Sequence, residues 1–236
     1  MQEVRAVFKE KLIRTPTVAS FRFNLPQRIG FIPGQFLQVI FDSERRDNKD
    51  LNKYLSFSCS PDNPYIEVTK RLSQSDFCRR LDSLKAGEEV LIKAPLGSCI
   101  FKPEEQKIAF LIGGIGITPV ISIVEYTTGN NLPNDICLFY SNRIEEEIAF
   151  KKELDAWAAA NPNFKVFYTV SECQPKEKNC IFGRIDRNLI LRYMPDYKER
   201  VILIFGPPKM VEAMQELCLE SGCSKDKIKT ENFIGY

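Results

Sequence analysis

The first hundred residues alternate short apolar or β-branched runs with clusters of turn residues. Runs of this length, bounded by Gly, Pro, Asn and Asp, are typical of β-strands. We expect six strands, at residues 4–11, 18–24, 35–41, 54–58, 65–70 and 89–94. One helix interrupts them, with Ser75 as its N-cap, residues 76–84 as its body and Gly87 closing it. Six strands at this spacing predict a small antiparallel β-barrel.

After residue 102 the pattern changes to apolar strands that alternate with helices. Strands are expected at 107–112, 135–140, 165–170 and 201–205, and helices from 118, at 145–159 and at 208–221. This alternation predicts a parallel sheet flanked by helices. We therefore predict a β plus α/β chain, with an N-terminal antiparallel barrel domain at residues 1–102 and a C-terminal parallel-sheet domain at 103–236.

Composition and charge narrow the class of protein. Of the 236 residues, 44% are hydrophobic and 27% charged, so the chain can bury a full core. The net charge of +2 lacks the basic excess of a dedicated nucleic-acid binder. The charge is uneven, because residues 1–102 carry 17 Lys and Arg against 12 Asp and Glu, while residues 103–236 carry 16 against 19. The first domain is therefore the basic one.

The chain has no histidine and eight cysteines. The absence of histidine excludes Ser-His-Asp and Cys-His catalysis and imidazole metal ligation. The cysteines are scattered without a CxxC pair, and only Cys218 and Cys223 share the C-x4-C spacing of plant-type iron-sulfur proteins. We expect reduced core thiols, no metal site and no intrinsic cluster.

Neither a secretion signal nor a membrane span is expected. Residues 1–14 lack the apolar core of a signal peptide. The most apolar stretch, 108–124, is shorter than the roughly 20 residues that a span needs and contains three glycines and Pro119. We expect a cytoplasmic protein with no nucleic-acid or membrane partner.

The sharpest local signal is the strand at 107–112 running into the sequence GGIGITP at 113–119. Glycines let a backbone approach a ligand, and Thr118 as N-cap with Pro119 at the first helical position leaves free amides for an anion. This turn would hold a dinucleotide pyrophosphate. The spacing is not G-x-G-x-x-G, and taken alone the segment could equally be a tight turn.

Four further segments, through their order along the chain, favour the nucleotide-binding interpretation of this turn over a plain tight turn. They are PGQF at 33–36, KYLS at 53–56, FGP at 205–207 and ENFIGY at 231–236. Together with the glycine turn, they make the chain resemble the ferredoxin-NADP reductase superfamily of flavoprotein electron-transfer enzymes over nearly its whole length. The resemblance implies an FAD-binding barrel followed by an NAD(P)-binding α/β domain.

The resemblance assigns the FAD site to the barrel. It implies that Lys53 replaces the arginine that meets the FAD diphosphate, that Leu55 packs against the isoalloxazine, and that Ser56 hydrogen-bonds near flavin N5. Tyr54 belongs to the same cofactor-binding segment, and Thr69, Lys70 and Ser75 would lie along the diphosphate. Lysine loses the bidentate fork of arginine, Leu55 stands where many relatives have Tyr, and the glycine usual before Ser75 is absent.

It assigns the nucleotide site to the second domain. The NAD(P)H-binding residues would be Gly113, Gly114, Gly116, Ile117, Thr118, Pro119, Phe205, Gly206 and Pro207. Phe205 stands where the family has a cysteine beside the nicotinamide, so it either only packs or slows hydride transfer through its effect on ring alignment. Arg143 is either a ligand of a 2′-phosphate or a surface arginine, which leaves NADH against NADPH open.

The implied catalytic residues are Ser56, Glu231 as a proton relay, and Tyr236 as the terminal aromatic that covers the flavin. Hydride would pass from NAD(P)H to FAD, and electrons would then leave to a separate protein such as a ferredoxin, a flavodoxin or an oxygenase component. The basic first domain predicts an acidic acceptor with salt-sensitive docking. Two alternatives are an electron-transfer subunit of a larger complex, and a nucleotide-binding regulatory module whose catalysis is impaired, as Lys53, Leu55 and Phe205 would suggest.

Overall fold

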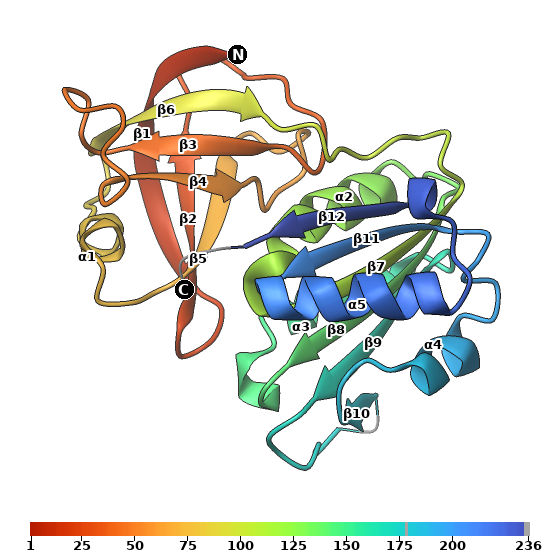
Figure 1. Cartoon of the computed structure of the whole chain (residues 1–236). Helices are drawn as coiled ribbons and strands as arrows, with labels where there is room; N and C mark the ends of the chain where they lie inside the picture. The colour runs from red at the N-terminus through yellow and green to blue at the C-terminus, as the bar shows by residue number, and fades with distance from the viewer. Residues whose placement is uncertain (178, 234–236) are drawn as a thin grey trace. The chain divides into compact units, whose positions relative to one another are not determined.

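The computed structural model describes residues 1–177 and 179–233 (Figure 1). It divides into two compact units. The first contains residues 1–101 and 118–126, and the second contains residues 102–117 and the chain from 127 onward. Each unit has its own six-stranded sheet, so each is described separately.

The first unit is an antiparallel barrel. Its strands are β1 (Gln2–Ile13), β2 (Val18–Asn24), β3 (Phe36–Ile40), β4 (Asn52–Ser56), β5 (Ile66–Arg71) and β6 (Glu89–Leu96). They follow the order β4-β3-β6-β1-β2-β5, and every neighbouring pair is antiparallel. A bridge between Phe57 and Val68 joins the two edge strands, β4 and β5, so the sheet nearly closes on itself. This confirms the predicted barrel.

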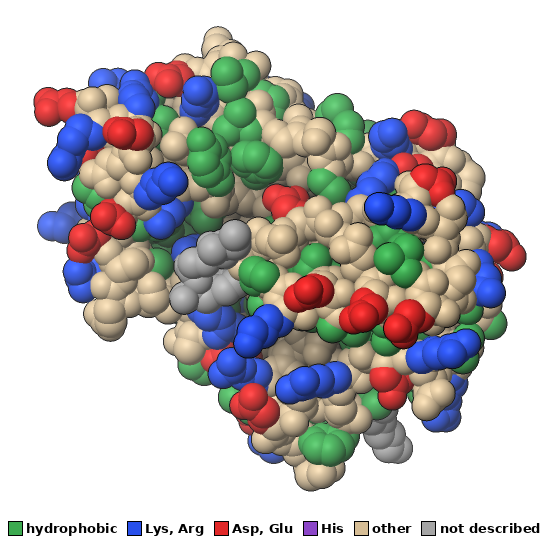
Figure 2. All heavy atoms as spheres, viewed as in Figure 1, with side chains coloured by type: hydrophobic (Ala, Val, Ile, Leu, Met, Phe, Trp, Pro, Cys, Tyr) green, Lys and Arg blue, Asp and Glu red, His purple; other side chains and the backbone are tan. Residues whose placement is uncertain are grey.

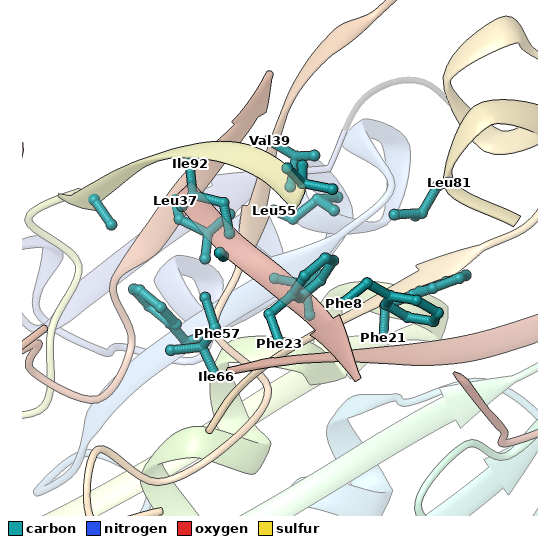
Figure 3. Packing of buried hydrophobic residues seen from close by; sticks show 14 of the residues in the cluster. Phe8, Phe21, Phe23, Leu37, Val39, Leu55, Phe57, Ile66, Leu81 and Ile92 are labelled. Atoms are coloured by element: carbon teal, nitrogen blue, oxygen red, sulfur yellow. The ribbon is translucent and has the colours of Figure 1, made fainter. Parts of the chain in front are cut away.

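Alternation along the strands builds the barrel core. Successive side chains of a strand point to opposite faces, so Phe21 and Phe23 of β2, two residues apart, point to the same face and both enter the apolar cluster. Figure 3 shows them with Leu37 of β3 and Leu81 of helix α1 (Asp76–Asp82). Phe8 and Phe23 meet edge to face with their ring centroids 5.6 Å apart. Helix α1 ends at Asp82, two residues before the predicted end.

A buried polar ring lies on the opposite face of β2 and β5, because its residues alternate with those of the apolar cluster. The Glu67 carboxylate, whose side chain is 2% exposed, accepts hydrogen bonds from Arg14 at 3.0 Å and Arg22 at 2.8 Å. The ring is completed by contacts among Ser20, Ser58, Thr69 and these three residues. Because buried polar groups need partners, the ring fixes β2, β5 and the end of β4 relative to one another.

The second unit is built on a parallel sheet. Its strands are β7 (Lys107–Gly113), β8 (Asp135–Asn142), β9 (Phe164–Val170), β10 (Cys180–Phe182), β11 (Val201–Gly206) and β12 (Ile228–Asn232). The order is β10-β9-β8-β7-β11-β12, with every neighbouring pair parallel. In Figure 1, helix α5 (Pro208–Glu220) lies in front of this sheet and α3 (Lys151–Ala160) behind it. This confirms the predicted α/β fold.

Helix α2 (Thr118–Gly129) follows β7 through a 3-10 turn at Gly114–Ile117. Its residues 118–126 belong to the first unit. There the Glu125 carboxylate accepts hydrogen bonds from the backbone N–H of Ser60 at 2.6 Å and from the Asn63 side chain at 3.1 Å. A carboxylate thus fixes the loop between β4 and β5 to the helix.

The helix predicted from 145 begins only at Lys151. Residues Glu145–Glu147 form a 3-10 turn, and Phe150 has a left-handed backbone with φ of 61°. The Glu145 carboxylate accepts hydrogen bonds from the backbone N–H groups of Lys176 at 2.9 Å and Glu177 at 3.3 Å. The predicted helical start was wrong because this carboxylate binds another loop instead of supporting a first helical turn.

Strands β10 and β12 and helix α4 (Arg187–Tyr193) were not predicted. In the described part of the chain, no helix is both long enough and apolar enough to span a membrane.

Candidate cofactor and nucleotide sites

The first candidate site lies where the barrel does not close. Beyond the Phe57–Val68 bridge, residues 53–56 of β4 and residues 69–71 of β5 form the two edges of the sheet. We call these two segments the strand opening. They contain six of the predicted FAD-binding residues, Lys53, Tyr54, Leu55, Ser56, Thr69 and Lys70.

Positive charge gathers at the strand opening. Burial lowers the pKa of Lys70 first, and the neighbouring charges of Lys53 and Arg71 lower it further. Within the described residues Lys53 makes no ion pair. Two ammonium groups held close together disfavour each other's charge, and a diphosphate between them would offset that repulsion. The charge at this opening therefore fits an FAD diphosphate.

Ser75 opens α1 as predicted, because its hydroxyl accepts a hydrogen bond from the backbone N–H of Cys78 at 3.3 Å. No role was predicted for Cys78 itself from the sequence. Burial opposes ionisation of its thiol, but hydrogen bonds with Ser73 and Ser75 and the charge of Lys70 outweigh burial and lower its pKa. The spacing Ser-x-x-Cys at a helix start was the available signal, since such positions favour thiolates.

Two residues of the strand opening have buried side chains, Leu55 in the barrel core and Thr69 in the polar ring. Leu55 is 9% exposed and belongs to the barrel core with Leu37 and Val39 (Figure 3). The Thr69 hydroxyl is hydrogen-bonded to Ser20 at 2.6 Å and Ser58 at 2.7 Å. Contact of either side chain with a flavin stays a prediction, and the core packing explains why a leucine suits position 55. By contrast, Tyr54 is 63% exposed and packs edge to face with Phe36.

The PGQF segment shapes the turn that leads into β3. Gly34 has φ of 98°, and a Cβ there would lie 2.6 Å from the carbonyl oxygen of Cys99. The Gln35 side chain accepts a hydrogen bond from Ile32 N–H at 2.8 Å and donates one to the Gly97 carbonyl at 3.2 Å. These contacts give this segment a structural role in the barrel.

The second candidate site is the turn at the carboxyl end of β7. We call residues 113–119 the glycine turn. A Cβ on Gly113 would lie 2.2 Å from Met210 Sδ, and one on Gly116 would lie 2.5 Å from the Phe205 carbonyl oxygen. Both glycines are therefore required by packing against β11 and α5. Gly114 differs, because its φ is 53° and a Cβ there would meet nothing within 4 Å.

Helix α2 starts at Thr118, so Pro119 is its second residue. The preceding 3-10 turn leaves no extended residue in the N-cap position, which differs from the predicted role of Thr118. Ile117 and Thr118 are buried. The open side of Gly114 and the first N–H groups of a twelve-residue helix together fit a nucleotide pyrophosphate.

Other residues predicted to bind the nucleotide or to act in catalysis lie at the strand ends next to the glycine turn. Phe205 is fully buried beside Phe110, so its ring has a packing role in this structure. Gly206, with φ of 158°, approaches Gly113, and Pro207 precedes helix α5. In the parallel pairing of β11 and β12, Phe205 lies opposite Glu231.

Glu231 is partly buried and makes no side-chain hydrogen bond or ion pair with any described residue. Burial raises the pKa of its carboxyl group above the ordinary value. A carboxyl group that holds its proton more tightly suits proton transfer near neutral pH. The remaining catalytic candidate, Tyr236, lies outside the described residues.

Arg143 follows β8 and is exposed. Its guanidinium lies 3.7 Å from the Glu172 carboxylate, which belongs to the loop after β9. Backbone hydrogen bonds from Ser171 and Glu172 to the Arg143 carbonyl hold the two loops together. A basic and an acidic side chain therefore share the position that would read a nucleotide ribose.

Comparisons with known proteins identify an FAD-binding and an NAD-binding domain. A family model described as an oxidoreductase FAD-binding domain matches residues 5–101, and one described as an oxidoreductase NAD-binding domain matches residues 110–216. The NADH-cytochrome b5 reductase 1 of Aspergillus terreus is 29% identical over 231 residues, which is 93% of this chain and 78% of that protein. The protein of the same name from Eremothecium gossypii is 29% identical over 92% of this chain and 78% of its own length.

Solved structures share the fold. The cytochrome b5 reductase domain of Ulva prolifera nitrate reductase has a TM-score of 0.84 at 22% identity, covering 98% of this chain and 97% of that one. A ferredoxin NADP+ reductase from Neisseria gonorrhoeae, with bound FAD and NADP, has a TM-score of 0.82 at 18% identity, covering 98% and 99%. The chain thus belongs to the ferredoxin-NADP reductase superfamily, as an NAD(P)H-dependent flavin oxidoreductase that binds FAD.

Proposed function

We propose that the protein oxidises NADH and passes the electrons to a small, acidic haem protein of the cytochrome b5 kind. The observation that carries this proposal is the similarity to NADH-cytochrome b5 reductases, which extends over 93% of the chain and both domains. The ferredoxin or flavodoxin expected from the sequence becomes an alternative outcome of the test.

The residues of the two sites would have different roles. Lys53 and Lys70 would bind the FAD diphosphate, and Ser56 would donate a hydrogen bond at the flavin edge. The glycine turn would hold the nucleotide pyrophosphate, and Glu231 would act as a proton relay. When bound, FAD supplies the step that accepts a hydride and releases electrons singly, while the chain orients the reactants.

The pair of Arg143 and Glu172 supports a preference for NADH. Glu172 lies within 3.7 Å of the guanidinium and is part of the same loop pair. An acidic side chain there would accept a hydrogen bond from a ribose 2′-hydroxyl and repel a 2′-phosphate. Arg143, already paired, would have to leave Glu172 to bind that phosphate.

The charge of the barrel domain supports an acidic acceptor. Residues 1–102 carry five more basic than acidic side chains. On the face that Figure 2 shows, the Lys and Arg side chains of the barrel are interspersed with acidic side chains, so the field on this face is diffuse. Docking through such a field chiefly accelerates encounter. The eight free cysteines support a reducing compartment such as the cytoplasm.

The test is an anaerobic absorbance experiment on the purified holoprotein. Equal amounts of NADH or NADPH are added first, and cytochrome b5, a ferredoxin or a flavodoxin is then added to the reduced protein. We expect rapid bleaching by NADH, slower bleaching by NADPH, and reoxidation by cytochrome b5. Reoxidation only by a ferredoxin or flavodoxin would replace the acceptor, and no bleaching by either nucleotide would favour the regulatory-module alternative.

A further inference from the structure

Cys218 and Cys223 are brought together by the end of helix α5. Ser221 is the C-cap, and Gly222 follows with a left-handed φ of 87°. The N–H of Cys223 donates to the Cys218 carbonyl at 3.0 Å, and the N–H of Gly222 donates to the Leu219 carbonyl at 2.9 Å. These two bonds define a Schellman motif, in which the side chains at the positions of Cys218 and Cys223 contact each other.

The interaction between the thiols agrees with this backbone geometry. Burial raises the pKa of both thiols; their interaction raises the pKa of Cys218 further and opposes the effect of burial on Cys223. Cys218 is 3% exposed and Cys223 7%, so Cys223 lies nearer the surface. Both are free thiols. This is the pair with the C-x4-C spacing noted in the sequence.

We propose that Cys218 and Cys223 form a modification site that hydrogen peroxide converts to an intramolecular disulfide. The Schellman turn brings the two side chains into contact, and proximity of the two sulfurs is the first requirement for disulfide closure. The proposal is independent of the acceptor and the nucleotide proposed above.

The chemistry balances with peroxide as the only oxidant. The Cys223 thiolate attacks a peroxide oxygen, an S–O bond forms, the O–O bond breaks, and hydroxide leaves and becomes water. The Cys218 sulfur then attacks the Cys223 sulfur, so an S–S bond forms, the S–O bond breaks, and the hydroxide leaves as a second water with the proton of the Cys218 thiol. Two thiols lose two electrons in total, and one peroxide gains them.

The surroundings decide which thiol reacts first. Burial raises the pKa of Cys218 to about 12 and also raises that of Cys223. For Cys223 alone, the charges of Lys198 and Lys227 and the hydrogen bond from Cys218 oppose the effect of burial. Because the thiolate is the nucleophile, the reaction is expected to be slow at neutral pH and to accelerate as pH rises.

The test uses the wild-type holoprotein, hydrogen peroxide and peptide mapping. Trypsin releases residues 210–225 as one peptide that contains these two cysteines and no other. After peroxide treatment and alkylation, we expect this peptide to lose two hydrogen masses and both alkylation sites, and to regain them on treatment with dithiothreitol. Rates at pH 7 and pH 9 should differ at least severalfold, with the faster at pH 9.

Two variants sharpen the result. Cys218→Ser should abolish the loss of two hydrogen masses and leave Cys223 to accumulate oxygen, whereas the control Cys173→Ser should leave disulfide formation unchanged. Peroxide that oxidises Cys99 and Cys173 while Cys218 and Cys223 remain open to alkylation would overturn the proposal. So would single oxidation of Cys223 in the wild type without a crosslink.

Discussion

At the scale of single residues, charge at the strand opening decides how FAD would be bound. Lys53 lies close enough to Lys70 to lower its pKa, and Lys53 has no ion-pair partner among the residues that the structure describes. A lysine presents one point charge, whereas arginine would present two parallel donors to a phosphate. Lys53 can therefore bind a diphosphate, but without the two parallel hydrogen bonds that an arginine would donate.

This yields a pair of opposite predictions. Lys53→Ala should weaken FAD binding about tenfold, because a hydrogen bond to a charged group contributes about 1.5 kcal/mol. Lys53→Arg should strengthen it. Titration of the apoprotein with FAD, followed by quenching of flavin fluorescence, measures both. Equal affinity of all three proteins would show that the diphosphate binds elsewhere.

Burial of the Glu231 carboxyl group lowers the stability of the folded protein at high pH. Burial raises its pKa, so the folded protein holds this proton more tightly than the unfolded chain does. The folded state is favoured below the unfolded pKa, and that advantage is lost as pH rises through the folded pKa. A group kept at this cost to stability is expected to serve the reaction.

Glu231→Gln should therefore raise the melting temperature at pH 8 and have little effect near pH 4, while slowing flavin reduction by NADH. Calorimetry across this pH range and stopped-flow absorbance supply the two readouts. A variant that is destabilised at pH 8 would contradict the role of burial. Unchanged reduction would remove Glu231 from the proton relay.

At the scale of elements, the glycine turn depends on close packing against β11. A Cβ on Gly116 would lie 2.5 Å from a backbone oxygen, whereas a Cβ on Gly129, in the last position of the helix α2 that follows, would meet nothing within 4 Å. Gly116→Ala should lower the free energy of unfolding by about 2–3 kcal/mol, as overpacked sites do.

Gly129→Ala is the matched control, and it should be neutral or stabilising by up to about 1 kcal/mol. Urea denaturation followed by circular dichroism measures both variants. NADH affinity should fall in Gly116→Ala and stay unchanged in Gly129→Ala. A Gly116→Ala protein with normal stability and normal NADH affinity would mean that the turn can shift away from β11 without cost.

The elements also show which parts of the fold could be predicted. The six barrel strands and the strands β7, β8, β9 and β11 carry continuous or alternating apolar residues, and all were predicted close to their observed positions. Strand β12 has the sequence IKTEN, and its residues are half-buried or exposed, so no apolar pattern marks it. It forms because β11 offers a free edge.

The site was harder to predict than the fold. Sequence order located the strand opening and the glycine turn, but it could not show that Gly113 and Gly116 face protein atoms while Gly114 faces open space. Nor could it show that Leu55 packs in the barrel core or that Thr69 is hydrogen-bonded within the polar ring. Such distinctions depend on which neighbours a strand meets, and that is set by tertiary packing.

At the scale of the whole molecule, the two domains carry opposite net charges, +5 for residues 1–102 and −3 for residues 103–236. An acidic acceptor would be attracted by the first and repelled by the second, so its orientation on encounter would be biased. A small acceptor such as ferricyanide needs no such docking.

We therefore expect the reduction of cytochrome b5 to slow severalfold between 20 and about 300 mM salt, because the Debye length falls to well below about 10 Å. Flavin reduction by NADH and ferricyanide reduction, measured in the same buffers, should change much less. A cytochrome b5 rate that does not vary with salt would exclude electrostatic docking on the barrel domain.

The incomplete closure of the barrel also matters during synthesis in the cell. Strands β4 and β5 are sheet edges connected by the Phe57–Val68 bridge, and an uncovered edge is a template for pairing with another chain. Newly made protein that lacks FAD is thus expected to self-associate. Size-exclusion chromatography of flavin-depleted protein should show oligomers that decline when FAD is restored, so the cofactor would serve as a guard against aggregation as well as a redox group.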